Sequence, residues 1–321
     1  MQNQYNVLII GAGNIGAFFD EPDSEDIITH AHAFKNHDGF KLSGFIDTDE
    51  SKASSAASIW GGEVFSSIED AFKQEEIDIV CITVPDKFHY SILKIVHNFP
   101  VKFVFVEKPI SKTLAEASEV LRIYNEKKIP VMVNYSRRFL SEFEYIKGEI
   151  DKGIFGNFVS GTGYYGKGLF HNGSHLINLL CYLIGDVARA TSFGSVRDFY
   201  DDDESISAVL AFEGNSTFTL NSVDCNLYTI FEMDLLFEKK RIRIVDSGFT
   251  IEKYSIQKSA RFKGYQNLVL SETVDTSFGK AMYCAVDNIY KHLIGHEEIK
   301  CSLSDGYNAM EICQMIRGKS E

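Results

Sequence analysis

Basic residues and long apolar runs are scarce in this 321-residue chain, and each scarcity excludes a class of protein. No stretch of about 18 consecutive apolar residues occurs, so the sequence predicts no helix that crosses a bilayer. The 32 Lys and Arg are outnumbered by 45 Asp and Glu. A net charge of -13 repels a polyanion, so we expect no nucleic-acid partner.

Cysteine is also rare, and its six residues show no Cys-x-x-Cys spacing that would indicate zinc or a redox centre. They are Cys81, Cys181, Cys225, Cys284, Cys301 and Cys313. Scattered thiols of this kind are typical of the reducing cytoplasm. The opening Met-Gln-Asn-Gln-Tyr does not lead from a basic segment into an apolar one, so we expect no secretory signal and a cytoplasmic location.

The length favours two domains, and the first 133 residues alternate short apolar strands with amphipathic helices. The predicted strands cover residues 6–10, 41–46, 77–83, 101–106 and 130–134, and a helix is predicted at 113–126. Strands that alternate with helices indicate a doubly wound parallel sheet, as in a Rossmann fold. We therefore expect an α/β dinucleotide-binding domain over residues 1–133.

The pattern changes after about residue 155, where longer alternating stretches follow one another. The predicted strands are 157–165, 205–212, 216–223, 229–237 and 240–245, with helices at 174–184, 281–293 and 303–317. Strands that neighbour one another in sequence favour a large, mostly antiparallel open sheet. We expect an α+β domain over 134–321, with the last helix packing back on the first domain as an alternative.

The most informative segment is residues 7–16, in which an apolar strand runs into Gly11-x-Gly13-x-x-Gly16. In a dinucleotide site the first glycine allows a tight turn, the second lets the backbone approach the pyrophosphate, and the third lets the next helix pack closely. A helix that opens at Asn14 would direct its N–H groups at the phosphates. The alternative is a glycine-rich turn that binds no ligand.

Asp47 ends the second predicted strand, where a carboxylate can accept hydrogen bonds from the ribose of NAD and repel the extra phosphate of NADP. Its distance from Gly16 is longer than is typical of the motif, which an inserted loop over residues 19–28 would explain. The alternative for Asp47 is a turn residue. We expect NAD as the cofactor, with NADP as the second choice.

Further motifs resemble those of the glucose–fructose oxidoreductase / inositol dehydrogenase / MocA family of NAD(P)-dependent oxidoreductases. Thr83-x-Pro85-x-x-x-His89 is similar to the family's T-x-P-x-x-x-H stretch, and Glu107-Lys108-Pro109 matches its E-K-P motif. Residues 134–139 and a helix that opens near Gly173 and His175 follow in the family's order. The likeness extends over almost the whole chain.

The resemblance implies hydride transfer between a nicotinamide and a carbinol or ketone carbon of a sugar, cyclitol or nucleotide sugar. It implies that Lys108 contacts the reacting hydroxyl and that the Lys108–Pro109 bond is commonly cis. Apart from the resemblance, Lys108 follows a predicted strand at the sheet edge where the cofactor must lie. An amine there can remove the proton of the reacting hydroxyl. A surface lysine is the alternative. The expected cofactor-binding residues are Gly11, Gly13, Asn14, Ile15, Gly16, Asp47, Thr83, Pro85, His89, Glu107 and Lys108.

The resemblance also makes His175 a catalytic candidate beside Lys108. The family's D-x-x-x-H pair corresponds here to His171 and His175, so histidine replaces the aspartate, and Asn178 stands where a later acid is usual. His175 would therefore lack the carboxylates that orient it. Two interpretations remain. In the first, a proton passes between His171 and His175, and in the second, Lys108 carries a larger share of the acid–base catalysis.

Other polar residues are candidates for substrate contacts, with ordinary packing as the alternative. The expected substrate-binding residues are Lys108, Tyr135, Arg138, Tyr165, Asn172 and His175, with Tyr164 and Lys167 in the same glycine-rich stretch. Two histidines four apart also fit one face of a zinc site, but no third ligand is evident and we expect no metal.

The motifs together favour an NAD-dependent dehydrogenase acting on a small sugar-like substrate, with Lys108 and His175 as the acid–base pair. A non-catalytic NAD-responsive sensor on the same fold is the competing hypothesis, because both acids near His175 are replaced. An imine or pyrrole reductase is a weaker third. The resemblance implies that the domain over 134–321 binds substrate and forms the oligomer, a homodimer or homotetramer.

Overall fold

The computed structural model describes residues 4–318, which form two compact units. The first comprises the residues up to Phe139 together with Gly279–Tyr307. The second comprises Leu140–Phe278 together with the residues from Asn308 on. These units, defined by packing, differ from the expected division at residue 133, because Gly279–Tyr307 pack with the first unit. The residue ranges of the cofactor-binding and substrate-binding domains stay a prediction. No helix within residues 4–318 has the length and apolar character needed to span a membrane.

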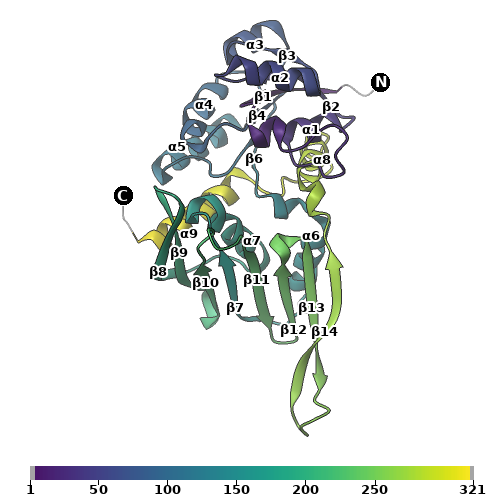
Figure 1. The fold of residues 1–321 in the computed structure, drawn as a ribbon, viewed down its shortest axis with the longest axis vertical. Coiled ribbons are helices and arrows are strands. Elements are labelled where there is room, and N and C mark those ends of the chain that lie inside the picture. Colours follow the sequence, from purple (N-terminus) through teal and green to yellow (C-terminus); the bar gives the residue numbers. More distant parts are fainter. Residues whose placement is uncertain (1–3, 319–321) are drawn as a thin grey trace. The chain divides into compact units, whose positions relative to one another are not determined.

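The first unit contains a six-stranded parallel sheet in the order β3-β2-β1-β4-β5-β6 (Figure 1). Its strands are β1 (Tyr5–Ile10), β2 (Phe40–Ile46), β3 (Glu63–Val64), β4 (Ile79–Ile82), β5 (Phe103–Val106) and β6 (Val131–Val133). Every residue of β4, β5 and β6 is buried, as expected for strands covered on both faces. The predicted Rossmann sheet is confirmed.

The helices of this unit include those that connect the strands and one from the later segment of the chain. They are α1 (His30–Lys35), α2 (Glu50–Trp60), α3 (Ile68–Gln74), α4 (His89–Val96), α5 (Leu114–Lys127) and, from the later segment, α8 (Ala281–Leu293). Thr113 and Glu116 form a capping box at the start of α5, close to the predicted start. The helix expected from Asn14 is one π-helical turn, Asn14–Phe18, and a regular helix resumes only at α1.

The inserted loop predicted over residues 19–28 separates that turn from α1, and Asp20 closes it. The buried Asp20 carboxylate accepts from the backbone N–H groups of Ile28 and Thr29, from the Thr29 hydroxyl at 2.5 Å and from His32 Nδ1 at 2.9 Å. Thr29 also caps α1 through its side chain. The loop therefore ends where α1 begins.

The segment Gly279–Tyr307 completes the core of the first unit. The ring of Tyr290 on α8 packs at the edge of Tyr5 and Phe40, and a side chain at Gly39 would overlap it. Farther along, the Val133 N–H donates to the Cys301 carbonyl at 3.0 Å. Segments far apart in the sequence are thus joined both by aromatic packing and by the backbone.

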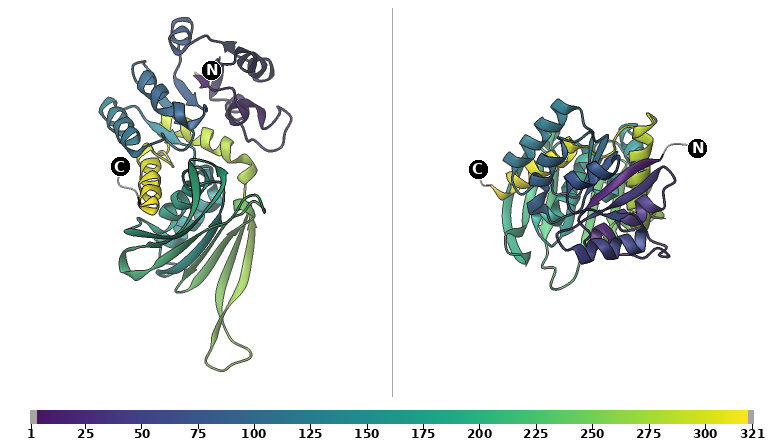
Figure 2. Two further views of the ribbon diagram at one scale, coloured as in Figure 1. Left: turned by 60° about the vertical axis from the view of Figure 1, so that its left-hand side comes forward. Right: turned by 90° about the horizontal axis from the view of Figure 1, so that it is seen from above.

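The second unit contains an eight-stranded sheet in the order β14-β13-β12-β11-β7-β10-β9-β8. Its strands are β7 (Phe158–Tyr165), β8 (Arg189–Tyr200), β9 (Asp203–Ala211), β10 (Thr217–Ser222), β11 (Phe231–Phe237), β12 (Lys240–Val245), β13 (Thr250–Lys258) and β14 (Gln266–Asp275). Only the β7–β10 pair is parallel among the described pairs, so the expected mostly antiparallel sheet is confirmed. The hairpin of β13 and β14 extends beyond the other strands of this sheet (Figures 1 and 2).

The helices of this unit are α6 (Ser141–Asp151), α7 (Ser174–Ile184) and most of α9 (Leu303–Arg317). α7 buries Leu176, Leu179, Leu180 and Leu183, each contributing about 1.5–3 kcal/mol through removal of its side chain from water. Leu176 lies against Gly163 on β7, where an added side chain would meet it at 2.9 Å. This packing fixes the first turn of α7 next to the end of β7.

Candidate active site

A different physical reason requires glycine at each of the three positions of the first βα turn. Gly11 has a φ of +104°, and a Cβ there would lie 2.7 Å from the Val84 nitrogen. A Cβ at Gly16 would lie 2.3 Å from the Gly11 carbonyl oxygen. At Gly13, by contrast, an added Cβ would meet no described atom within 4 Å. The protein's own packing therefore explains two glycines but leaves the space above Gly13 for a ligand.

Polar groups brace this turn from both neighbouring strands. The Thr83 hydroxyl, after β4, donates to the Gly11 carbonyl at 2.5 Å. The Asp47 carboxylate, after β2, accepts from the Ala12 N–H at 2.7 Å and from the Asp49 N–H at 2.9 Å. Each carboxylate oxygen keeps a second lone pair that a ribose hydroxyl can use. The site therefore fits a dinucleotide: a bare backbone position at Gly13, flanked by an acceptor at Asp47.

The remaining cofactor candidates of this segment lie around the turn. Asn14 is exposed and Ile15 half-buried at the start of the π-helical turn, while Pro85 lies three residues after the end of β4 and precedes a short 3-10 turn. The first N–H groups of a helical turn have no partner within the turn, so a phosphate is expected to bind at such a start. A contact of Asn14, Ile15 or Pro85 with NAD stays a prediction.

Lys108 follows β5 at the carboxyl edge of the same sheet and is half-buried. The Lys108–Pro109 peptide bond is cis, as the resemblance implied. His89 holds this segment, because its Nδ1 lies 2.7 Å from the Pro109 carbonyl oxygen and its Nε2 lies 2.8 Å from that of Val84. Burial lowers the pKa of His89 despite those two carbonyls. His89 is 1% exposed and ties the two motif loops together. A contact of His89 with the cofactor stays a prediction.

Glu107, the first residue of the E-K-P motif, belongs to a buried hydrogen-bonded chain. Its carboxylate lies 2.8 Å from His30 Nε2 and accepts from Asn134 Nδ2 at 2.6 Å, while His30 Nδ1 lies 3.0 Å from Cys81 Sγ. Burial raises the pKa of Glu107, but the hydrogen bond from His30 and the nearby positive charges bring it below its usual range. A carboxylate only accepts, so His30 donates through Nε2 and, as a neutral ring, accepts a hydrogen bond from the Cys81 thiol at Nδ1. Glu107 thus anchors the loop that carries Lys108, and its contact with the cofactor stays a prediction.

His171 and His175 belong to the second unit, His171 on the turn that links β7 to α7 and His175 at the start of α7. His171 Nδ1 lies 2.8 Å from Asp203 Oδ2, and the imidazole stacks on the Tyr200 ring at a centroid distance of 3.7 Å. His175 is half-buried in the first turn of α7, and Asn178 is buried one turn later. His171 therefore has a carboxylate partner, which sequence reasoning did not find because the two residues are 32 positions apart.

The substrate candidates fall into two groups. Tyr165 is fully buried and its hydroxyl bonds both the N–H and the carbonyl of Ile206, and burial raises its pKa well above the usual range. Arg138 is buried and donates to the Lys300 carbonyl and to Asp305. Both side chains hold the fold, because their polar groups are committed to neighbouring segments.

The other group comprises Asn172, Lys167 and Tyr164, which lie within seven residues of His171 in the sequence, and Tyr135 in the first unit. Asn172 donates from Nδ2 to the Gly166 carbonyl at 2.8 Å, and Lys167 has a φ of +64° in the turn before it. Tyr164 faces outward from β7 and is 39% exposed. Tyr135 is buried after β6. Substrate contacts by Asn172, Lys167, Tyr164 and Tyr135 stay predictions.

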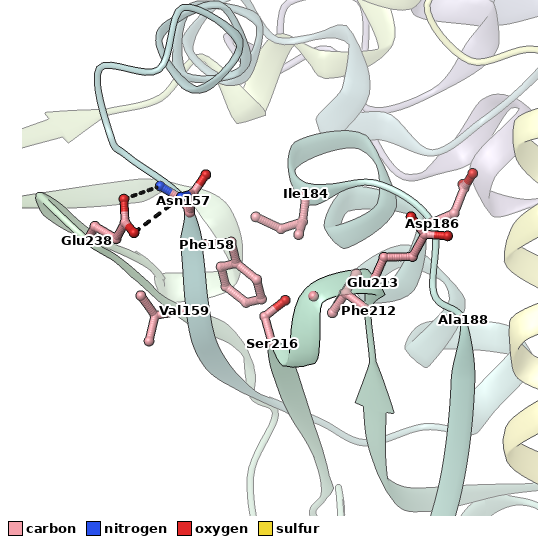
Figure 3. Close-up of a pocket in the computed structure, with 11 residues that line it drawn as sticks. Asn157, Phe158, Val159, Ile184, Asp186, Ala188, Phe212, Glu213, Ser216 and Glu238 are labelled. Atoms are coloured by element: carbon pink, nitrogen blue, oxygen red, sulfur yellow. Dashed lines mark hydrogen bonds between the residues drawn. The ribbon is translucent and has the colours of Figure 1, made fainter.

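A pocket of about 780 Å³ opens elsewhere in the second unit and contains none of the predicted site residues (Figure 3). It is lined at the start of β7 by Asn157 and Phe158 and by three carboxylates, Asp186, Glu213 and Glu238. Glu238 points at Asn157 and accepts from its backbone and its side chain. Within residues 4–318, no group of three or more His, Cys, Asp or Glu side chains is arranged to hold a metal ion.

Comparison with known proteins relates the first unit to oxidoreductases by sequence, and both units to solved structures by fold. Residues 5–135 match the Gfo/Idh/MocA family model, described as an oxidoreductase family with an NAD-binding Rossmann fold. An inositol 2-dehydrogenase of Corynebacterium glutamicum is 26% identical over 163 residues, which cover 50% of this chain and 44% of that protein. The chain thus spans about half the length of the curated relatives that it matches first.

Solved structures match nearly the full chain at low sequence identity, so they show a similar fold. A UDP-N-acetylglucosamine 3-dehydrogenase from Acidithiobacillus ferrooxidans has a TM-score of 0.78 at 16% identity, covering 98% of this chain and 97% of its own. The WlbA dehydrogenase from Bordetella pertussis, in complex with NADH and UDP-GlcNAcA, has a TM-score of 0.77 at 16% identity, covering 98% and 95%.

The family match falls on the segment that holds the glycine turn, Asp47 and the E-K-P loop. The solved structures relate the fold of each unit. Residues 5–135 therefore match the Gfo/Idh/MocA family of oxidoreductases, with an NAD-binding Rossmann fold.

Proposed function

We propose that this protein is an NAD-dependent dehydrogenase that interconverts a secondary alcohol and a ketone on a sugar, cyclitol or nucleotide sugar. The observation that carries the proposal is the placement of Lys108. Its loop leaves β5 at the same sheet edge as the glycine turn and is held by His89 on one side and by the Glu107–His30 chain on the other. Ligands of doubly wound sheets bind at this edge, so the amine is positioned for a substrate beside the cofactor.

The chemistry divides between the cofactor and the chain. When bound, the nicotinamide of NAD takes up the hydride from the carbinol carbon or returns it. The hydroxyl proton must leave as the carbonyl forms, and a neutral Lys108 amine accepts it in the proposed direction. In the reverse direction the ammonium returns that proton to the developing alkoxide. His175 and His171 share the substrate hydroxyl from the second unit, in line with the family resemblance.

Replacement of Lys108 tests this assignment. Lys108→Met preserves the length and apolar stem of the side chain but removes the amine, so we expect kcat to fall at least about 100-fold. NAD affinity should change less than about threefold, because the glycine turn and Asp47 remain. Turnover is followed by NADH absorbance with a panel of inositols, free sugars and nucleotide sugars. Wild-type-like turnover in the variant would remove Lys108 from the mechanism.

A nucleotide sugar is our preferred substrate class. The run His171-Asn172-Gly173-Ser174-His175 resembles family members of bacterial surface-polysaccharide pathways. The dehydrogenase from Acidithiobacillus ferrooxidans and the one from Bordetella pertussis, which share the fold, are named for or bound to UDP sugars. The same panel, run with NAD and with NADP, distinguishes this class from free sugars and cyclitols.

A non-catalytic NAD-responsive sensor is the second candidate, supported by His171 and Asn178 at positions where the family usually has acids. Such a protein would bind NAD without reducing it in the presence of any compound of the panel. Reduction of NAD by one polyol decides for the enzyme. Turnover with a cyclic imine alone would instead indicate an imine reductase.

A further inference from the structure

Asp203 is the first residue of β9 and lies 3% exposed beneath the turn that carries His171. Its carboxylate accepts from the backbone N–H groups of Phe170 and His171, both at 2.9 Å. It also lies 2.8 Å from His171 Nδ1 and accepts from Arg317 Nη2 at 2.9 Å. A buried carboxylate with four donor groups is satisfied in its ionised form.

The surrounding residues leave room for the carboxylate and orient the ring. Gly168 has a φ of +81°, and a Cβ there would lie 2.3 Å from Asp203 Oδ2, so glycine is needed for this close approach. The Tyr200 ring stacks on the imidazole with an interplanar angle of 13°. Arg317, in the last turn of α9, lies over the Phe170 ring and pairs with the far oxygen of the carboxylate.

The chemistry of the pair determines which nitrogen of His171 carries the proton. An ionised carboxylate only accepts, so the nitrogen that faces it must donate. In the neutral imidazole this places the hydrogen on Nδ1 and the basic lone pair on Nε2.

We propose that Asp203 is a positioning residue that fixes neutral His171 in the Nδ1–H tautomer and presents its Nε2 for proton transfer. The inference rests on the proposed function, because it gives His171 a use in the proton relay. Asp203 thereby supplies the carboxylate that the sequence lacks at position 171 itself, from a strand 32 residues away.

A measurement of the His171 tautomer tests the inference without a known substrate. In protein labelled with ¹⁵N-histidine at about pH 9, where an ordinary imidazole is neutral, two-bond ¹⁵N–¹H spectra distinguish Nδ1–H from Nε2–H. His171→Gln assigns the signal by its loss. We expect Nδ1–H in the wild type, and an Nε2–H tautomer in this spectrum would overturn the proposal even if no Asp203 variant folds.

Two matched variants separate positioning from loop stability. In Asp203→Asn the amide oxygen can keep a backbone N–H while the amide nitrogen donates to His171, so the ring should switch to Nε2–H. Asp198→Asn is the control, because Asp198 also holds this loop through the Lys167 N–H at 2.7 Å and Ser205 at 3.1 Å but does not bond His171. The control should leave the tautomer unchanged, and equal effects of the two variants would reduce Asp203 to a loop anchor.

Kinetics with a turned-over substrate then connect tautomer and function. We expect Asp203→Asn to lower kcat at least about tenfold with less than about a threefold change in KM, and Asp198→Asn to retain kcat within about threefold. A switched tautomer with unchanged kcat would overturn the catalytic use of the pair. Absence of turnover by the wild type on every compound would refute the proposed dehydrogenase but leave the tautomer result standing.

Discussion

Gly13 is the one glycine of the first βα turn that the packing of the described residues does not explain. Because an added Cβ meets no described atom within 4 Å, and φ at this position is -88°, Gly13→Ala should fold with an unchanged Tm. The methyl group occupies the space through which a pyrophosphate approaches the backbone. We expect NAD affinity to fall at least about tenfold, or roughly 1.4 kcal/mol, in a calorimetric titration.

Gly11→Ala is the matched control for that experiment. Gly11 has a φ of +104°, and an added Cβ would lie 2.7 Å from the Val84 nitrogen, so an alanine here strains the folded state. This variant should therefore lose about 1–3 kcal/mol of folding stability. A stable Gly13→Ala protein that binds NAD as the wild type does would contradict our placement of the phosphates.

Asp47 offers a test of cofactor choice at the same turn. Asp47→Asn keeps an oxygen that can accept from the Ala12 N–H but removes the charge that repels a 2′-phosphate. We expect the preference for NAD over NADP to shrink about tenfold, corresponding to roughly 1.4 kcal/mol. The ratio of dissociation constants for the two cofactors measures this directly. An unchanged ratio would mean that Asp47 serves only to brace the turn.

At the scale of the elements, the loop between the π-helical turn and α1 depends on Asp20. Burial raises the pKa of Asp20, but hydrogen bonds from Thr29, Ile28 and His32 bring it below the usual value. Its stabilisation is therefore fully present above the unfolded-state pKa of about 3.9 and is lost as pH falls through the lower folded-state pKa.

Asp20→Asn should accordingly lower the free energy of unfolding by about 2 kcal/mol at neutral pH, because charged acceptors form the stronger hydrogen bonds. Urea denaturation between about pH 7 and 5 should show a constant difference from the wild type, which narrows below about pH 4. Asp23→Asn, at an exposed position of the same loop, is the control and should change little. A pH-independent difference would contradict the charge-based explanation.

The elements that the sequence revealed are those with a clear burial pattern. β11 alternates buried and half-buried residues along its whole length, and α7 carries its leucines on a buried face, so both were predicted within two residues. β14 exposes nearly every residue and β3 has two residues, so neither has a periodicity to detect. β8, β13 and α6 were also missed, the first because its side chains are mostly exposed.

The site was predictable where it lies in one motif and hidden where it depends on contacts across the fold. The glycine turn, Asp47 and Lys108 could be proposed from the sequence because neighbouring residues form recognisable motifs there. His30 and Asp203 could not, since each acts on a residue that is 77 or 32 positions away in the sequence. The sequence also did not show that His89 and Tyr165 have their polar atoms bonded to backbone groups.

At the scale of the whole molecule, the second unit exposes apolar side chains on an edge strand. β14 is an edge strand that exposes Leu268, Val269 and Leu270 by 39%, 39% and 47%. An exposed apolar edge of this kind favours association, and a hairpin that extends alone is marginally stable in water. We therefore keep the prediction of a homodimer or homotetramer.

Light scattering at micromolar concentration checks the oligomeric state. The expected mass is two or four times that of one chain, and Leu270→Glu should shift it toward the monomer by placing a charge in the contact. A solvent-exposed control, Lys263→Glu at the tip, tests whether any added negative charge has this effect. A monomeric wild type would contradict the prediction.

The return of Gly279–Tyr307 to the first sheet has a consequence for anyone who transplants the nucleotide half into another protein. A gene fragment that stops after Phe139 would encode all six strands but would leave Tyr5 and Phe40 without the Tyr290 ring and β6 without its bond to Cys301. Such a cassette needs the distant stretch spliced back by a short linker. The first unit is therefore one folding module built from two separate chain segments.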